Sequence, residues 1–86
     1  MNMKLEQRFG TFGEWLSFYL QFYGITQKEM AFELCVAQQT VGSWIRNERC
    51  IGIRNLVYVC LTLEKYSEET YEELMIESTL LFKRLS

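Results

Sequence analysis

Apolar residues recur along most of the chain at the spacing of one helical face, three and four positions apart. The clearest example lies within residues 12–23, where the apolar stripe consists of Phe12, Trp15, Leu16, Tyr19, Leu20 and Tyr23. Such a stripe is typical of an amphipathic helix that buries one side against a core. Gly24 follows the stripe and suits a left-handed cap at the helix end. The pattern therefore predicts a core helix over residues 12–23.

Helix starts are marked by capping boxes, in which a hydroxyl at the N-cap and a glutamate three positions later satisfy two backbone amides. Three such pairs occur, Thr11 with Glu14, Thr26 with Glu29, and Thr70 with Glu73. Together with the apolar spacing they predict a series of short helices over about residues 12–23, 27–34, 38–46, 53–64 and 71–85. The predicted fold class is therefore an all-α, compact bundle of five short helices.

The chain has 86 residues, which suffices for one hydrophobic core but not for two. We expect a single folding unit, in which residues 1–66 form one domain and residues 67–86 supply a C-terminal helix. Hydrophobic residues make up 49% and charged residues 23%, so the chain is expected to fold as an ordinary globular protein. No apolar run approaches the roughly 20 residues that cross a bilayer, and no signal peptide is recognised. We therefore expect a cytoplasmic protein without a membrane partner.

The residue types that most catalytic and metal sites require are missing. The sequence has no histidine and no aspartate, which removes the usual general base, most catalytic triads and the commonest metal ligand. Cys35, Cys50 and Cys60 form no C-x-x-C pair and are interpreted as free thiols. We therefore expect neither an enzyme nor a bound cofactor or metal.

The net charge of −2 at first opposes an interaction with nucleic acid, because phosphates attract cations. The charges are, however, unevenly distributed. Residues 1–63 carry six basic and five acidic side chains, whereas residues 64–86 carry three basic and six acidic ones. The acidic excess therefore belongs to the C-terminal part, and a modestly basic surface remains available elsewhere.

Two short helices joined by a few residues are expected within residues 26–47, with the small Ala31 where they would cross closely. The sequence TQKEMAFELCVAQQTVGSWIRNERC, which begins at Thr26, resembles the lambda-repressor-like helix-turn-helix family (Cro/repressor, xenobiotic-response-element type). The resemblance covers about residues 12–64, and its family-like positions include Gln27, Ala31, Leu34, Val36, Thr40, Val41, Trp44 and Arg49. It implies a sequence-specific DNA-binding transcription regulator, more often a repressor.

Some positions depart from the family pattern. Cys35 stands where the family commonly has a glycine in the turn, which implies either a less left-handed backbone or local strain. Ala37 replaces the usual serine or threonine N-cap of the following helix, at a cost of about 1 kcal/mol unless another group covers the amides. Ile45 and Ile51 also differ from residues common in the family. These departures affect the docking pose on DNA rather than the fold.

The resemblance places the helix at about 38–46 in the major groove of DNA, with its first residues over the base edges. The candidate base-reading residues are Gln38, Gln39, Thr40 and Ser43. A glutamine amide carries a donor and an acceptor that match adenine N6 and N7, so each half-site is expected to contain an A·T pair. The lack of a side chain at Gly42 indicates either that this helix approaches DNA closely or that it packs tightly within the protein. Trp44 is expected in the core rather than stacked on a base.

Phosphate contacts are assigned to the polar and basic residues around the reading helix, namely Gln27, Lys28, Arg46, Arg49 and Arg54. An alternative for each arginine is a surface ion pair with Glu48. The last helix carries more apolar residues than a small monomer needs, so the candidate dimer contacts are Leu74, Leu81, Phe82 and Leu85. The alternative is that this helix closes the core of the monomer.

The predicted partner is double-stranded DNA, bound by a homodimer at a pseudo-palindromic operator with half-sites about 34 Å apart. A second hypothesis is a protein-binding adaptor, an antirepressor or an antitoxin that keeps the helix-turn-helix fold. The low basicity of the chain favours that second hypothesis. A protein antagonist is a further candidate partner, because the chain has no room for an effector domain.

Overall fold

The structure is a computed structural model that describes residues 9–85, and of residues 82–85 it describes the backbone only. Within that part the helices are α2 (Phe12–Tyr23), α3 (Gln27–Leu34), α4 (Gln38–Ile45), α5 (Ile53–Tyr66) and α6 (Tyr71–Leu85). The all-α fold class is confirmed, and the helix bounds differ from the predicted ones by at most two residues. No helix in the described part is long and apolar enough to cross a membrane.

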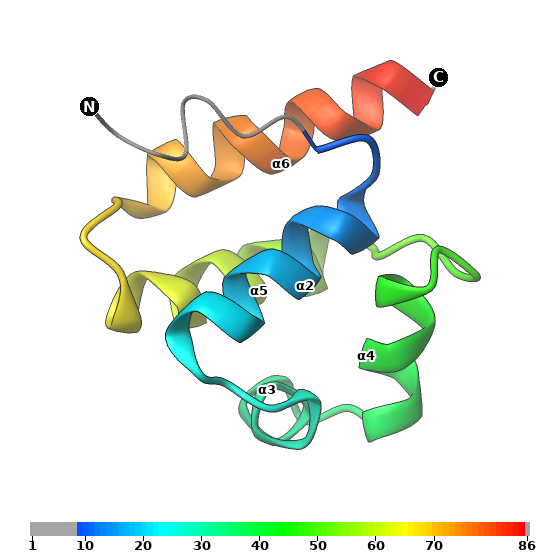
Figure 1. Cartoon of the computed structure of the whole chain (residues 1–86), viewed down its shortest axis with the longest axis vertical. Coiled ribbons are helices and arrows are strands. Elements are labelled where there is room, and N and C mark those ends of the chain that lie inside the picture. The colour runs from blue at the N-terminus through cyan, green and yellow to red at the C-terminus, as the bar shows by residue number, and fades with distance from the viewer. Residues whose placement is uncertain (1–8, 86) are drawn as a thin grey trace.

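The helices are arranged around α2 and α5, which run through the middle of the molecule (Figure 1). α6 packs on α5 and α2 along one side, while α3 and α4 pack on each other and on α5 and α2 respectively. Figure 1 places α6 and α3 at opposite ends of the longest axis, which measures 36 Å. The helix-turn-helix pair and the C-terminal helix therefore face away from each other.

The helix starts use the hydroxyl caps that the sequence predicts. The boxes at 26–29 and 70–73 form in both directions, with N–H···O distances of 2.8–3.2 Å. At Thr11 the hydroxyl accepts from the amide of Glu14 at 3.2 Å, and the Glu14 carboxylate meets that same hydroxyl rather than the Thr11 amide. The expected reciprocal box at Thr11 is therefore replaced by a one-sided cap.

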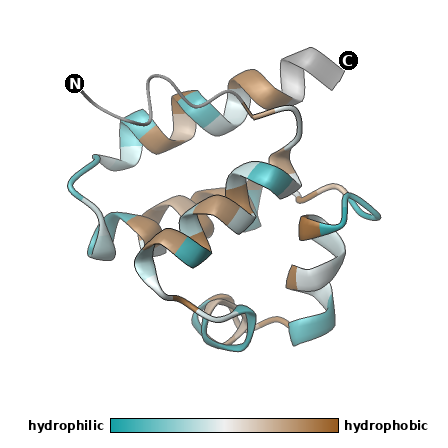
Figure 2. Cartoon of the chain, in the orientation of Figure 1, coloured by the Kyte–Doolittle hydropathy of each residue, from teal (hydrophilic) through white to brown (hydrophobic). Residues whose placement is uncertain are grey.

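The core lies between the apolar faces of all the described helices, and Figure 2 shows these faces most clearly on α2 and α5. Its largest fully buried side chains are Trp15, Trp44, Tyr19, Leu16, Met30, Leu56, Leu63 and Leu74. Trp44 is thus a core residue, as predicted. Burial raises the pKa of the Cys60 thiol to about 11, so this cysteine behaves as a small apolar side chain, whereas Cys35 and Cys50 are exposed.

A buried polar cluster fastens α6 to α2. The hydroxyl of Tyr19 lies 2.5 Å from Oε2 of Glu69 and 2.7 Å from Oε1 of Glu77, with each carboxylate positioned as an acceptor. The indole Nε1–H of Trp15 donates to the same Glu77 oxygen at 3.2 Å. Burial is the main reason that the pKa of Tyr19 is raised, and Glu77 raises it further. The phenol therefore stays protonated, and its one proton can be donated to either of the two carboxylates.

The last helix closes the core of the single chain with part of its apolar side. Leu74 and Leu81 are buried against the other helices of the same chain, so neither lies on a surface that a second copy can reach. The exposed apolar surface of α6 is smaller than its number of apolar residues suggests, because this helix packs on both α2 and α5. Phe82 and Leu85 fall outside the side chains that the structure describes.

Candidate nucleic-acid interface

The turn between α3 and α4 has a left-handed residue at its start. Cys35 adopts φ 57° and ψ 42°, while its N–H donates to the carbonyl of Phe32 at 3.2 Å and that of Val36 donates to Ala31 at 3.0 Å. A residue with a β-carbon pays about 1–2 kcal/mol in this conformation. Of the two alternatives for a cysteine at this position, the structure therefore has the strained, left-handed one.

The C-terminal end of α4 is clamped to the start of α2 through Asn47. Its side chain accepts a hydrogen bond from the amide of Gly13 and donates one to the hydroxyl of Thr11, each at 3.1 Å. Asn47 is itself left-handed, with φ 59°, a conformation in which asparagine is enriched. A β-carbon at position 13 would lie 2.2 Å from the carbonyl oxygen of Ile45. Only glycine therefore allows α2 to approach the last turn of α4 this closely.

α4 separates its core residues from its polar ones. Val41 and Trp44 are buried, whereas Gln38 and Gln39 are exposed and the other two candidate reading residues are half-buried. The hydroxyl of Ser43 donates to the carbonyl of Thr40 at 2.6 Å, which leaves its oxygen available as an acceptor. The N-cap residue Ala37 makes no side-chain hydrogen bond, as predicted. The outer face of α4 therefore presents two unobstructed glutamine amides.

A shallow polar groove runs between α3 and α4, lined by Gln27, Gln38, Gln39, Gly42 and Arg46. The structure thus brings together residues that the sequence assigned to two different roles, base reading and phosphate contact. The amide oxygen of Gln27 lies 3.2 Å from the point that a β-carbon of Gly42 would occupy. We call these five residues the reading groove.

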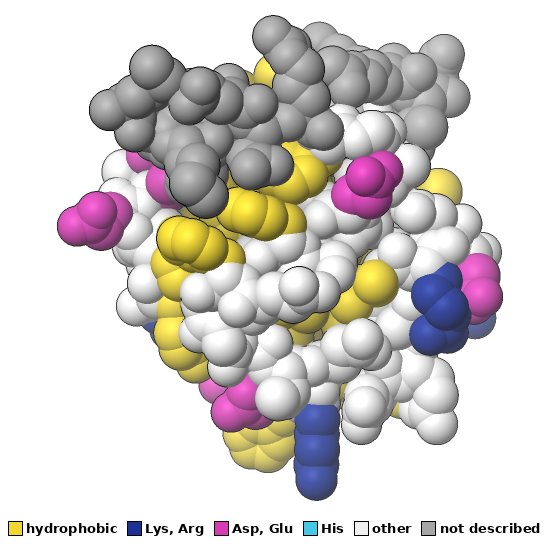
Figure 3. Space-filling view, viewed as in Figure 1, with side chains coloured by type: hydrophobic (Ala, Val, Ile, Leu, Met, Phe, Trp, Pro, Cys, Tyr) yellow, Lys and Arg dark blue, Asp and Glu magenta, His cyan; other side chains and the backbone are white. Residues whose placement is uncertain are grey.

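The remaining candidate phosphate contacts lie outside the reading groove. Lys28 borders a separate hollow on the side of α3 toward α5, beside Phe32 and Tyr66. Arg49 lies in the loop after α4, and Arg54 is exposed in the first turn of α5. Figure 3 shows Lys and Arg side chains over the lower and right parts of the view, where Figure 1 places α3, α4 and that loop.

The sequence identified the polar residues of α4 but missed the contact that positions this helix. Gly13 was passed over, although a glycine in the first turn of a helix is unfavourable and signals a close approach. Asn47 suits the left-handed position after a helix, which is a local role. Neither residue carries a sign of its partner, because the two lie 34 positions apart in the chain.

The sequence model of a helix-turn-helix family matches residues 23–68, more than half of the chain. The match includes α3, the turn at Cys35, α4 and all of α5. It confirms the family that the sequence resembles. No curated protein and no solved structure matches the chain.

Proposed function

The chain belongs to the lambda-repressor-like helix-turn-helix family of DNA-binding regulators, and from this premise we propose that it represses transcription as a homodimer on a pseudo-palindromic operator. The observation that carries the proposal is the reading groove, which gathers three glutamine side chains and one arginine on the exposed faces of α3 and α4. In helix-turn-helix proteins the second helix of this pair enters the major groove of DNA.

Within this proposal Gln38 and Gln39 read the bases. Both are exposed in the first turn of α4, the part of a reading helix that reaches base edges. Thr40 and Ser43 follow on the same helix as secondary contacts. Gln27, at the start of α3, contacts a backbone phosphate, and Lys28, Arg49 and Arg54 supply sequence-independent attraction to the duplex.

Gln38→Ala and Gln39→Ala are each expected to lower the preference for the selected operator over a base-substituted one by about tenfold, because an adenine loses its bidentate partner. Non-specific binding should change little. The measurement is selection of bound sequences from a random duplex pool, followed by titration of single-base variants. Gln21→Ala, on the exposed side of α2, is the matched control.

Two results would contradict this assignment. If both glutamine variants select the wild-type motif with unchanged affinity, another element reads the bases. If the well-folded wild-type protein enriches no sequence at all, the DNA-binding proposal fails. The protein-binding alternative, an adaptor or antirepressor, would then be the one to pursue.

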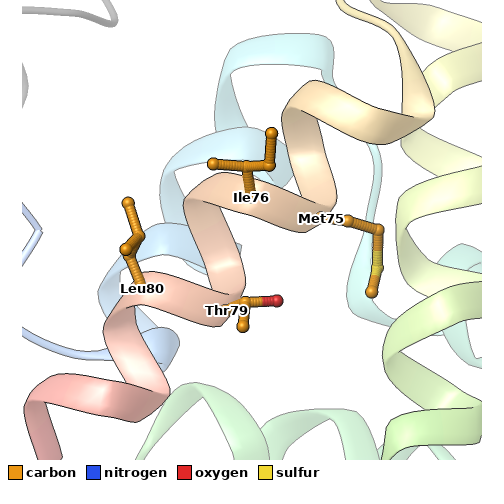
Figure 4. A pocket seen from close by; sticks show the side chains of 4 residues that line it. All are labelled: Met75, Ile76, Thr79 and Leu80. Carbon is orange, nitrogen blue, oxygen red and sulfur yellow. The ribbon is translucent and has the colours of Figure 1, made fainter.

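The homodimer needs a contact that leaves the α4 helices of both copies on the same side of the dimer, so that both can reach one DNA duplex. α6 exposes Ile76 and Leu80 beside Met75 and Thr79 (Figure 4), but this helix lies at the end of the molecule opposite α3 (Figure 1). A two-fold axis through that surface would separate the two reading grooves. We therefore place the second copy elsewhere.

We place the contact on the face of α5 that carries Ile53, Val57 and Leu61. Ile53 and Leu61 are 70% and 40% exposed, and α5 begins directly after the loop that follows α4. If two α5 helices cross antiparallel with Val57 level with Leu61 of the other copy, Arg54 lies level with Glu64, since both spacings are three residues. Both of these charged side chains are exposed. The face is therefore complementary to itself in apolar contact and in charge.

A single helix face buries less than the roughly 800 Å² per partner of a standard interface, so we expect a weak dimer that assembles fully on DNA. Leu61→Glu should abolish cooperative binding to a duplex with two half-sites and leave binding to one half-site unchanged. Leu80→Glu, an equally polar change on α6, should preserve cooperativity. The opposite pattern in a gel-shift titration, with analytical ultracentrifugation in parallel, would move the dimer contact to α6.

A further inference from the structure

Arg46 does not extend away from the protein at the end of α4. Its side chain folds back over the preceding turn, so that a β-carbon at Gly42 would lie 2.8 Å from Nη1 and 3.5 Å from Cζ. The same point is 3.2 Å from the amide oxygen of Gln27. The guanidinium group therefore lies inside the reading groove, over the surface that a larger residue at position 42 would occupy.

The ion pair with Glu48 fixes which edge of the guanidinium group remains available. Nε of Arg46 donates to Oε2 of Glu48 at 3.1 Å. The two terminal amino groups hold the other four donors of the side chain. Arg46 is also the one formally charged residue among those that line the groove. The pair of terminal amino groups is thus presented beside the glutamine amides of α4.

We infer that Arg46 reads a guanine in the operator, and that Gly42 is the residue that gives the guanidinium group access to it. The inference rests on the proposed DNA-binding function and changes the role of Arg46 from phosphate contact to base contact. Two parallel N–H donors match O6 and N7 of guanine, the commonest specific contact in the major groove. A phosphate contact carries no such requirement for position within the groove.

The glycine itself supports this role. Glycine in the middle of a helix costs about 1 kcal/mol relative to alanine, so its presence calls for a gain elsewhere. An exposed ion pair such as Arg46–Glu48 contributes at most about 1 kcal/mol, which does no more than offset that cost. Access of the guanidinium group to a base supplies the gain. This role also combines the two alternatives left open for Gly42. The glycine packs internally against the guanidinium group, and that packing lets the group approach DNA closely.

The test compares Arg46→Lys and Gly42→Ala with the wild-type protein on the selected operator and on duplexes changed at one base pair each. Arg46→Lys keeps the charge but removes the parallel pair of donors, and Gly42→Ala displaces the guanidinium group. Both should relax the preference for the same G·C pair by about tenfold, while preferences at the other positions persist. The dependence of affinity on salt should stay as in the wild type, since no charge is lost.

Gly52→Ala is the matched control, because a β-carbon there meets open space. Circular dichroism of each variant shows whether the fold is retained, and Arg46→Lys tests the inference even if Gly42→Ala fails to fold. Equal loss of affinity on all sequences, or an unchanged guanine preference in both variants, would overturn the inference and leave DNA binding intact. Failure of the wild-type protein to select any sequence would overturn both.

Discussion

Gly13→Ala is expected to lower the free energy of unfolding by about 3 kcal/mol. The added β-carbon would lie 2.2 Å from the carbonyl oxygen of Ile45 and 2.8 Å from Nδ2 of Asn47. The first of these is a backbone atom, which cannot swing aside as a side chain can. The first turn of α2 must then move away from the end of α4, and the hydrogen bond from the Gly13 amide to Asn47 is lost.

Urea unfolding followed by tryptophan fluorescence measures this effect, because Trp15 and Trp44 lie in the two helices that separate. Gly52→Ala serves as the control and should leave the unfolding midpoint near that of the wild type. Affinity for DNA should fall as well, since α4 loses the contact that sets its position. A Gly13→Ala variant as stable as the wild type would show that α2 and α4 approach less closely than described.

Tyr19→Phe is expected to destabilise the protein by about 3 kcal/mol at neutral pH. A neutral donor forms its strongest hydrogen bonds with charged acceptors, and the substitution removes such a donor. The substitution keeps the ring in the core but removes the donor that lies 2.5 Å from Glu69 and 2.7 Å from Glu77. These two carboxylates hold α6 and the residues before it against α2. Tyr58→Phe, which removes an exposed phenol, is the control.

The same residue makes stability fall at alkaline pH. The pKa of Tyr19 is raised in the folded state by burial and by Glu77, whereas in the unfolded chain it is about 10. Above that pH the unfolded state releases the phenolic proton and the folded state retains it, so unfolding becomes more favourable. The stability advantage of the wild type over Tyr19→Phe should therefore be full below pH 10 and shrink above it. Parallel curves for the two proteins up to pH 11 would contradict a buried, protonated Tyr19.

The helices were predictable because their signals are local. A hydroxyl and a glutamate three positions apart mark the starts of α3 and α6, and the spacing of apolar residues fixes the buried face of each helix. The two glutamines of α4 followed from the same logic, since they lie off the apolar stripe that contains Val41 and Trp44. Trp44 was assigned to the core by its three-residue spacing from Val41, and it is buried.

The remaining features depend on contacts between distant parts of the chain. The clamp between Gly13 and Asn47 joins residues that no periodic pattern relates. Leu74 and Leu81 were expected at a surface contact, but both are buried. The sequence of α6 does not show how much apolar surface α2 and α5 leave for this helix to cover. The backward fold of Arg46 over Gly42 is likewise a matter of side-chain conformation, which residue spacing alone leaves open.

The placement of α6 opposite α3 also has a consequence for how quickly the protein meets DNA. Residues 26–54 carry four basic and three acidic side chains, whereas the acidic excess lies toward the end formed by α6 and the residues before it. Among the described side chains, this separation of charge forms an electric dipole whose less negative end carries the reading groove. In the field of a duplex such a dipole rotates the acidic end outward before contact, so that collisions occur with the groove leading. A chain of net negative charge can in this way orient its approach to a polyanion, and added salt weakens that orientation.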